Sequence, residues 1–169
     1  MLLDLSAAFD TISHSELLRR LENEYRIGGR VLKWIKSYLS GRFAKVKIES
    51  TESSSKPIEV GVPQGSILGP LLFILYMKDL EKIAALYGLT IHLYADDSKI
   101  YVSFSPESID EVTERLQKCM AHIKLWMAHS MLKLNPEKTE VLVLKSKWSK
   151  APEIENILMK FPPVALLVG

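Results

Sequence analysis

Residues 91–104 read IHLYADDSKIYVSF, and this stretch decides how the fold is predicted. Apolar residues alternate with polar ones on both sides of the pair Asp96-Asp97. An alternation with a period of two is typical of half-buried strands, and a short polar interruption between two such runs is typical of a hairpin. The stretch therefore predicts two antiparallel strands with two aspartates at their tip.

Further helices and strands are predicted on both sides of this hairpin. Ser13 and Glu16 have the spacing of a capping box at the start of a helix, and Gly41 is placed to end the next one. Other patterns predict strands at residues 2–5, 43–48, 57–60 and 139–144, an apolar helix at 67–86 and an amphipathic helix after Ser105. Because strands and helices are interspersed without strict βαβ alternation, we expect an α+β fold, a mostly antiparallel sheet with helices packed on one face.

Composition narrows the class of protein. The 169 residues are 47% hydrophobic and 25% charged, which is typical of a globular domain, and the net charge of +2 excludes a strongly basic nucleic-acid coat protein. The single cysteine, Cys119, allows neither an internal disulfide nor a cysteine-rich zinc site, and we expect a buried, inert thiol in an intracellular protein. The longest nearly apolar run, residues 67–77, is about half of the ~20 residues that cross a bilayer as a helix.

Three acidic residues are the main candidates for chemistry. If the first strand pairs with the hairpin, Asp4 meets Asp96 and Asp97 at one edge of the sheet. Converging carboxylates repel each other unless a cation neutralises them, and carboxylate oxygens suit Mg²⁺ or Mn²⁺ rather than zinc. Two such ions, ~3.5–4 Å apart, would support phosphoryl transfer. A solvated turn and an ordinary strand-ending acid are the alternative interpretations.

The loop GVPQGS at residues 61–66 is a second candidate site. Its glycines allow the backbone to approach a ligand closely, Gln64 offers an amide, and Ser66 begins a helix whose free N–H groups suit a phosphate or a sugar. The same residues are also typical of a plain strand-to-helix connection in which Ser66 is only an N-cap.

Four segments, taken in order, resemble the successive palm motifs of reverse transcriptases from LINE-type (non-LTR) retrotransposons. They are LDLSAAFDT at 3–11, GVPQGSILGP at 61–70, YADD at 94–97 and KLNPEKT at 133–139. The resemblance covers residues 2–144. It implies a polymerase palm that copies an RNA template from a DNA primer, with deoxynucleoside triphosphates as substrates and two divalent ions, Mg²⁺ or Mn²⁺, as cofactors.

The resemblance also implies a role for each matching residue. Asp4 and Asp96 would be the metal-binding catalytic aspartates, with Asp97 as an auxiliary carboxylate. Phe9 would floor the sugar pocket and collide with a ribose 2′-hydroxyl. The remaining matches are Gln64, Gly65 and Ser66, which would lie against the substrate, and Lys138, which would lie near the leaving pyrophosphate, with Lys133 as a nearby competitor.

The ends of the sequence do not match the fingers or the thumb of this family. We therefore expect a truncated palm at residues 1–147, an irregular tail at 148–169, and weak or absent activity in the isolated chain. A non-catalytic retrotransposon remnant and a nucleic-acid- or partner-binding module are the alternatives.

Some basic and aromatic residues lie outside the four motifs. Lys36, Arg42, Lys45 and Lys47 could contact phosphates or simply form a solvated face. We expect Trp34 to be a packing residue rather than a base-stacking platform.

Overall fold

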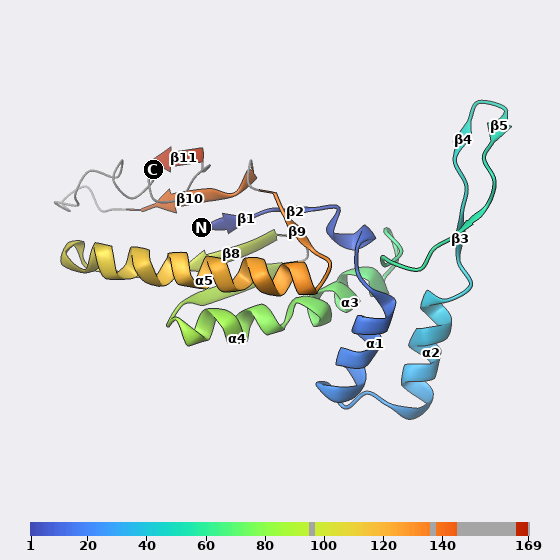
Figure 1. Ribbon diagram of the computed structural model, residues 1–169, viewed down its shortest axis with the longest axis horizontal. Coiled ribbons are helices and arrows are strands. Elements are labelled where there is room, and N and C mark those ends of the chain that lie inside the picture. The colour runs from blue at the N-terminus through green and yellow to red at the C-terminus, as the bar shows by residue number, and fades with distance from the viewer. Residues whose placement is uncertain (95–96, 136–137, 145–164, 169) are drawn as a thin grey trace. The chain divides into compact units, whose positions relative to one another are not determined.

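The computed structural model of the protein describes residues 1–94, 97–135, 138–144 and 165–168 (Figure 1). The chain divides into two compact units, one formed by Met1–Ala7 with Met77–Gly169 and the other by Ala8–Tyr76. We describe each unit by itself.

The first unit is built on a five-stranded sheet with the order β11-β10-β1-β8-β7. Every neighbouring pair is antiparallel except β10 and β11, which are parallel. The strands are β1 (Leu2–Leu3), β7 (Thr90–Tyr94), β8 (Asp97–Tyr101), β10 (Glu140–Val143) and β11 (Ala165–Val168). A separate antiparallel pair joins β2 (Leu5–Ser6) to β9 (Lys133–Leu134). The predicted mixture of helices with antiparallel strands is confirmed.

The hairpin that decided the prediction is present as β7 and β8. Ile91 faces Ile100 across the pair and both are buried, whereas His92 and Lys99 are exposed, so the alternation does set the two faces. The second strand ends at Tyr101, and Phe104, which we predicted to continue it, is 40% exposed beyond the strand.

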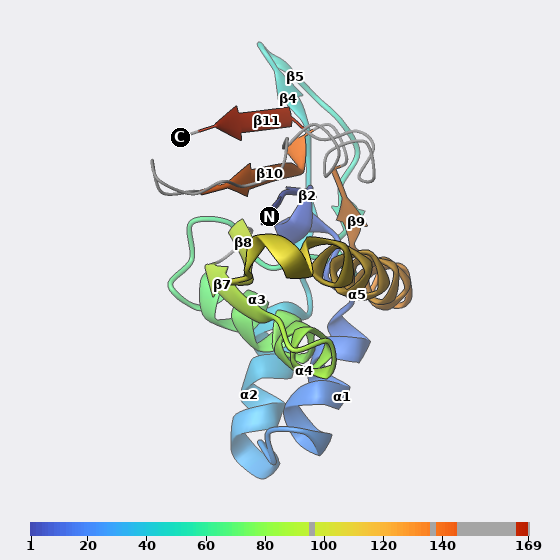
Figure 2. The same ribbon diagram turned by 90° about the vertical axis from the view of Figure 1, so that its left-hand side faces the viewer.

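Two helices pack on one face of this sheet, as predicted. In both ribbon views α4 (Asp79–Leu86) and α5 (Ile109–His129) lie on the same side of the strands (Figures 1 and 2). The short helix η2 (Pro106–Ser108) immediately precedes α5. Buried α5 residues, including Ile123 and Met127, turn towards the core. Cys119 is fully buried on this helix, and burial raises the pKa of its thiol to about 11, which confirms the expectation of an inert thiol.

The second unit contains the remaining helices of the described residues, the last of which ends one residue inside the first unit. These are η1 (Ala8–Asp10), α1 (His14–Asn23), α2 (Gly29–Leu39) and α3 (Leu68–Met77). The single helix that we predicted for residues 67–86 is therefore two, separated by Lys78. Asp79 and Glu81 explain the second start, because acidic side chains in the first turn favour a helix N-terminus.

The start of α1 shows which part of the predicted capping box forms. The Ser13 hydroxyl accepts a hydrogen bond from the Glu16 amide at 3.3 Å, so Ser13 is the N-cap. The Glu16 carboxylate instead accepts hydrogen bonds from Arg19 and from Arg20, whose side chain is 5% exposed. These bonds, with that of Arg19 the strongest, lower the pKa of Glu16 to about 2.

The segment after α2 departs most from its prediction. It forms four two-residue strands, β3 (Phe43–Ala44), β4 (Lys47–Ile48), β5 (Thr51–Glu52) and β6 (Lys56–Pro57), paired as β3 with β6 and β4 with β5. The residues that we predicted to face inward, such as Val46 and Ile48, are 63% and 70% exposed. The alternation is present in the sequence, but no other element in the described part of the chain covers a face of this two-stranded hairpin, so neither face is buried.

The predicted tail can be compared with the structure only in part. Residues 145–164 and 169 lie outside the described residues, and 165–168 form β11, so the boundary at residue 147 stays a prediction. None of the helices in the described part of the chain combines the length and the apolar character that crossing a bilayer requires.

Candidate functional site

Strand pairing brings Asp4 and Asp97 together. In the antiparallel pair of β1 with β8, Leu2 faces Lys99 and Leu3 faces Ser98. The same register continued by one residue places Asp4 opposite Asp97. The prediction that the first strand pairs with the hairpin is therefore confirmed, although these residues are more than ninety positions apart in the chain.

The two aspartates lie on the outer face of the sheet. Leu3 and Ser98 are buried, and because side chains alternate along a strand, Asp4 and Asp97 fall on the opposite face. Asp4 is half-buried and Asp97 is exposed. Across the described residues neither carboxylate forms an ion pair. Within the described residues, their oxygens are therefore not committed to a lysine or arginine.

The third predicted acid, Asp96, lies outside the described residues. Its chain neighbour Asp97 pairs with Tyr94 at the end of the hairpin, so only two residues, 95 and 96, connect the two strands. The role of Asp96 stays a prediction. Among the described residues, no three histidine, cysteine, aspartate or glutamate side chains are grouped closely enough to hold a metal ion.

A loop from the fourth motif runs past the other side of Asp4. The first strand changes partner here, because Leu2 faces Glu140 of β10 whereas Leu5 faces Leu134 of β9. The Asn135 amide donates a hydrogen bond of 2.9 Å to the Asp4 carbonyl in the gap between these pairs. Thr139 Oγ1 donates to the Asn135 carbonyl at 2.8 Å and ties the end of the loop to its beginning.

Lys138 belongs to this loop. Its side chain is exposed and has no ion pair within the part of the chain that the structure describes. Lys133, the competing lysine, is also exposed and lies on β9 opposite Ser6. The backbone thus places the loop that contains Lys138 on one side of Asp4. Strand β8, with Asp97, lies on the other side of Asp4.

In the second unit, the loop at 61–66 is bound to the end of the first motif. The Gly61 amide donates to the Ile12 carbonyl at 2.7 Å, and the Val62 amide donates to the Phe9 carbonyl at 2.8 Å. Gly61 has a φ of +85°, and a Cβ atom there would lie 2.9 Å from the Phe9 carbonyl oxygen. Only glycine fits this close approach without strain. His14 Nε2 lies 2.6 Å from the Gly61 carbonyl oxygen on the other side.

The polar side chains of this loop make contacts within the unit. Gln64 Nε2 donates to Asp10 Oδ1 at 3.0 Å. Ser66 Oγ donates to the Pro63 carbonyl at 2.7 Å and accepts from the Gly69 amide at 3.0 Å. Ser66 therefore acts as a helix cap, which was one of its two predicted roles. Gly65 has a φ of +76° with open space where a Cβ would lie.

Phe9 is held by an aromatic contact. Its ring stacks on Phe73 of α3 with the centroids 4.7 Å apart and the planes 29° from parallel. Phe73 is fully buried and Phe9 is half-buried, so one side of the Phe9 ring is fixed while part of it stays accessible.

The sequence prediction missed three residues that shape this part. Asp10 holds Gln64, His14 contacts Gly61, and Phe73 supports Phe9. Asp10 lies within the quoted motif LDLSAAFDT and could have been singled out by its position there. Nothing in the spacing of His14 or Phe73 pointed to these contacts.

Comparisons with known proteins agree with the resemblance. Residues 1–156 match the family described as reverse transcriptase (RNA-dependent DNA polymerase). The chain is 34% identical over 141 residues, 80% of its length, to the RNA-directed DNA polymerase from mobile element jockey of Drosophila funebris, and this covers 15% of that relative. It is 29% identical over 176 residues to a probable RNA-directed DNA polymerase from transposon BS of Drosophila melanogaster, covering 99% of the chain and 19% of the relative. The chain thus spans less than a fifth of the length of these relatives.

Proposed function

This chain belongs to the reverse transcriptase family, in its LINE-type branch, and from that premise we propose that its sheet is the palm of an RNA-directed DNA polymerase. In this role it joins the α-phosphate of a deoxynucleoside triphosphate to the 3′-hydroxyl of a DNA primer that is paired with an RNA template. The chain supplies the residues around the reacting atoms.

The observation that carries the proposal is the position of Asp4 opposite Asp97. Two carboxylates that face each other across neighbouring strands destabilise the sheet by their repulsion. Neither is neutralised by an ion pair in the described part of the chain. A cation bound between the two carboxylates would offset this repulsion, and the neighbouring Asp96 would add a third carboxylate.

Reverse transcriptases generally use divalent metal ions, and we propose Mg²⁺ or Mn²⁺ as two ions held by Asp4, Asp96 and Asp97. The donor set fits these ions, because carboxylate oxygens on an accessible sheet face are the ligands that hard cations prefer. When bound, such ions stabilise the negative charge that develops on the attacking and leaving oxygens.

The remaining residues bind and orient the substrate. Phe9, whose ring stacks on that of Phe73, would collide with a ribose 2′-hydroxyl and so favour deoxynucleotides. Gln64 and Gly65 would lie against the nucleotide, with the Gln64 amide oriented by Asp10. Ser66 contributes by capping α3 and thereby fixing the loop.

Lys138 would act on the leaving group. An exposed ammonium on the loop beside Asp4 can neutralise charge on the pyrophosphate or donate a proton to it. We propose this role for Lys138 rather than Lys133, because the loop residues follow Asn135, which is bonded to Asp4, whereas Lys133 pairs with Ser6.

The isolated 169 residues should extend a primer weakly or not at all. They span less than a fifth of the length of the relatives, and misplacement of a substrate by about 1 Å can lower a rate ~100-fold. The proposal is therefore tested by two readouts, of which one does not need turnover.

The first readout is metal binding to the chain itself. Titrated Mn²⁺ should broaden the amide NMR signals of residues 3–5 and 97–99 first, and Asp4→Asn with Asp97→Asn should abolish that pattern. Glu111→Gln with Glu114→Gln, which also removes two carboxylate charges at exposed positions of α5, should leave it intact. Broadening that is scattered over all exposed carboxylates would contradict the metal site.

The second readout is primer extension on an annealed RNA template by the jockey polymerase in which this chain replaces the segment that it matches. Asp96→Asn should abolish extension, and Phe9→Ala should allow ribonucleotides to be added. Undiminished extension by Asp96→Asn would contradict the proposed function.

A further inference from the structure

The basic residues of the chain are concentrated in one segment of the second unit. Residues 26–47 contain seven lysines and arginines and no aspartate or glutamate, although the whole chain has a net charge of only +2. This segment comprises the turn before α2, the helix itself and the first strands after it. The rest of the chain is therefore net acidic, and the segment is a local positive region that the overall charge conceals.

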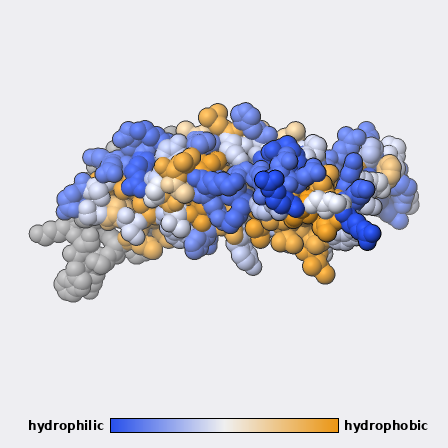
Figure 3. Space-filling view, turned by 90° about the horizontal axis from the view of Figure 1, so that it is seen from below, coloured by the Kyte–Doolittle hydropathy of each residue, from blue (hydrophilic) through white to orange (hydrophobic). Residues whose placement is uncertain are grey.

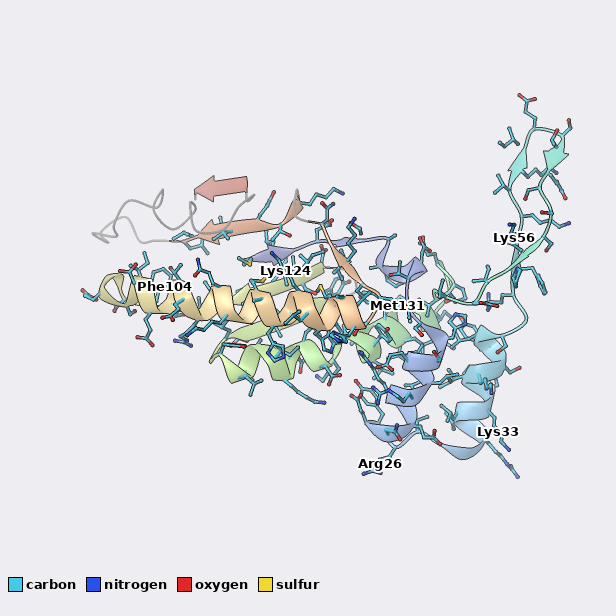
Figure 4. The ribbon with its side chains drawn as sticks, in the orientation of Figure 1. Arg26, Lys33, Lys56, Phe104, Lys124 and Met131 are labelled. Carbon is cyan, nitrogen blue, oxygen red and sulfur yellow. The ribbon has the colours of Figure 1, made fainter. Side chains whose placement is uncertain are left out.

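The outer face of α2 carries part of this charge. Ile35 and Leu39 are buried on the inner face of the helix, whereas Arg30, Lys33 and Lys36 are exposed. Figure 4 shows the side chain of Lys33 extending from α2 on the side away from α1. Throughout the described residues these three cations have no ion pair. By contrast, Lys45 and Lys47 lie 3.6 and 3.7 Å from the Glu52 carboxylate.

An aromatic side chain is exposed among these cations. Trp34 is 57% exposed, which differs from the expectation that it is a packing residue. Its ring stacks on that of Tyr38, with the centroids 6.1 Å apart and the planes 22° from parallel. The Arg42 guanidinium lies 4.8 Å from the Tyr38 ring centroid and also donates from Nε to the Tyr38 carbonyl. Trp34 is thus the outer layer of a fixed stack rather than a loose side chain.

Figure 3 shows that hydrophobic residues reach the surface among hydrophilic ones on the face that it draws. Exposure of a single apolar residue is ordinary and carries no argument. What distinguishes Trp34 is that its neighbours on the same helix are unpaired cations and that the helix contains no acid.

We propose that the outer face of α2, formed by Arg30, Lys33, Trp34 and Lys36, binds single-stranded nucleic acid. The three cations would contact phosphates, and an unpaired base would stack on the Trp34 ring. Charge complementarity favours a polyanion over a neutral partner, and the exposed ring favours an unpaired strand over a duplex, whose bases are already stacked. The inference goes beyond the proposed polymerase function, because it needs neither a metal ion nor nucleotide addition.

The test is the binding of a fluorescein-labelled 12-nucleotide oligouridylate to the chain, measured by fluorescence anisotropy in metal-free buffer. Lys33→Gln with Lys36→Gln is compared with Lys118→Gln and Lys124→Gln, which removes the same charge from exposed positions on α5. Circular dichroism and the thermal midpoint establish that each variant is folded. Inorganic polyphosphate, a chain of phosphates without bases, is the competitor.

The α2 double variant should bind the oligonucleotide about tenfold more weakly and flatten the slope of log affinity against log salt by about 1.4. Trp34→Ala should weaken oligonucleotide binding at least about fivefold without changing that slope, and Trp34→Phe should restore most of it. Polyphosphate binding should respond to the lysine changes and not to Trp34→Ala.

Several results would overturn the inference. They are the absence of oligonucleotide binding by the unaltered chain, an equal loss in the α5 control, and a loss of polyphosphate binding in Trp34→Ala. Competition by an oligoglutamate peptide of equal charge as strong as that by unlabelled oligouridylate would assign the surface to an acidic protein segment instead. None of these measurements depends on primer extension, so failure here is separable from failure of the proposed function.

Discussion

The aspartate pair and the loop at 61–66 are held in place by different means. Backbone pairing of β1 with β8 positions Asp4 and Asp97, and their carboxylates take no part in the described ion pairs. In the loop, by contrast, the side chains of Gln64 and Ser66 are themselves part of what fixes the backbone.

This difference predicts whether a substitution should change ligand binding or the free energy of unfolding. Side chains that the backbone positions can be changed with little effect on folding, so their removal should affect ligand binding. Side chains and glycines that hold the backbone should affect the free energy of unfolding. Five substitutions, with Gly65→Ala as a control, test this distinction by urea denaturation of the chain.

Gly61→Ala should have the largest effect. A left-handed φ and contacts of 2.9 to 3.0 Å with the Phe9 and Asp10 backbone leave no room for a methyl group. We expect the free energy of unfolding to fall by about 3 kcal/mol. Gly65→Ala is the matched control, because its φ is also positive but open space surrounds its Cβ position. It should cost about 1 kcal/mol, and equal losses at the two glycines would show that the contacts with the first motif are not decisive.

Glu16→Gln should cause the next largest loss in the free energy of unfolding, and this loss should depend markedly on pH. The folded pKa of about 2 lies below the ordinary value of 4.5, so the carboxylate stabilises the fold fully above pH 4.5 and loses this contribution as pH falls towards 2. We expect a loss of about 1–2 kcal/mol at pH 7, because the substitution leaves the nearly buried Arg20 with one charged partner fewer. The loss should shrink between pH 4.5 and 2.5. A difference that is the same at both ends would contradict the proposed role of the charge.

Asp10→Ala and Gln64→Ala should each have a smaller effect. Their hydrogen bond of 3.0 Å is exposed, and a double-mutant cycle should give a coupling of about 0.5–1 kcal/mol. The control pair is Asp10 with Gly65→Ala, for which no coupling is expected. Zero coupling between Asp10 and Gln64 would mean that the loop is held by its backbone bonds alone.

Asp97→Asn should have the smallest effect on stability. The side chain is exposed and lies opposite a like charge, so the free energy of unfolding should change by no more than about 0.5 kcal/mol, and it should rise rather than fall. A loss above 1 kcal/mol would show that Asp97 supports the fold and would remove the contrast with the loop.

Local patterns predicted the parts of the fold that depend on neighbouring residues. The period of two between Ile91 and Ile100 identified the hairpin, and Ser13 identified the start of α1. Because Asp4 ends a short apolar strand and Asp97 begins a hairpin strand, their meeting followed from one assumption about pairing.

Features that depend on distant contacts could not be predicted in this way. The exposure of Val46 and Ile48 reflects the lack of a packing layer, which no local period reveals. The contacts of His14 with Gly61 and of Phe73 with Phe9 join residues about fifty or more positions apart, and their side-chain types are equally common in roles of pure packing. The exposure of Trp34 could not be predicted for the same reason. A large aromatic side chain is typical of an interior, but on α2 more than half of this side chain is exposed.

The two-residue strand β1 has a consequence for biosynthesis. Leu2 pairs with both Lys99 and Glu140, so this strand, once translated, has both of its neighbours only after Glu140 has been made. Asp4 has no strand opposite it until β8 has been made, so the pair of Asp4 with Asp97 cannot assemble on a shorter nascent polypeptide.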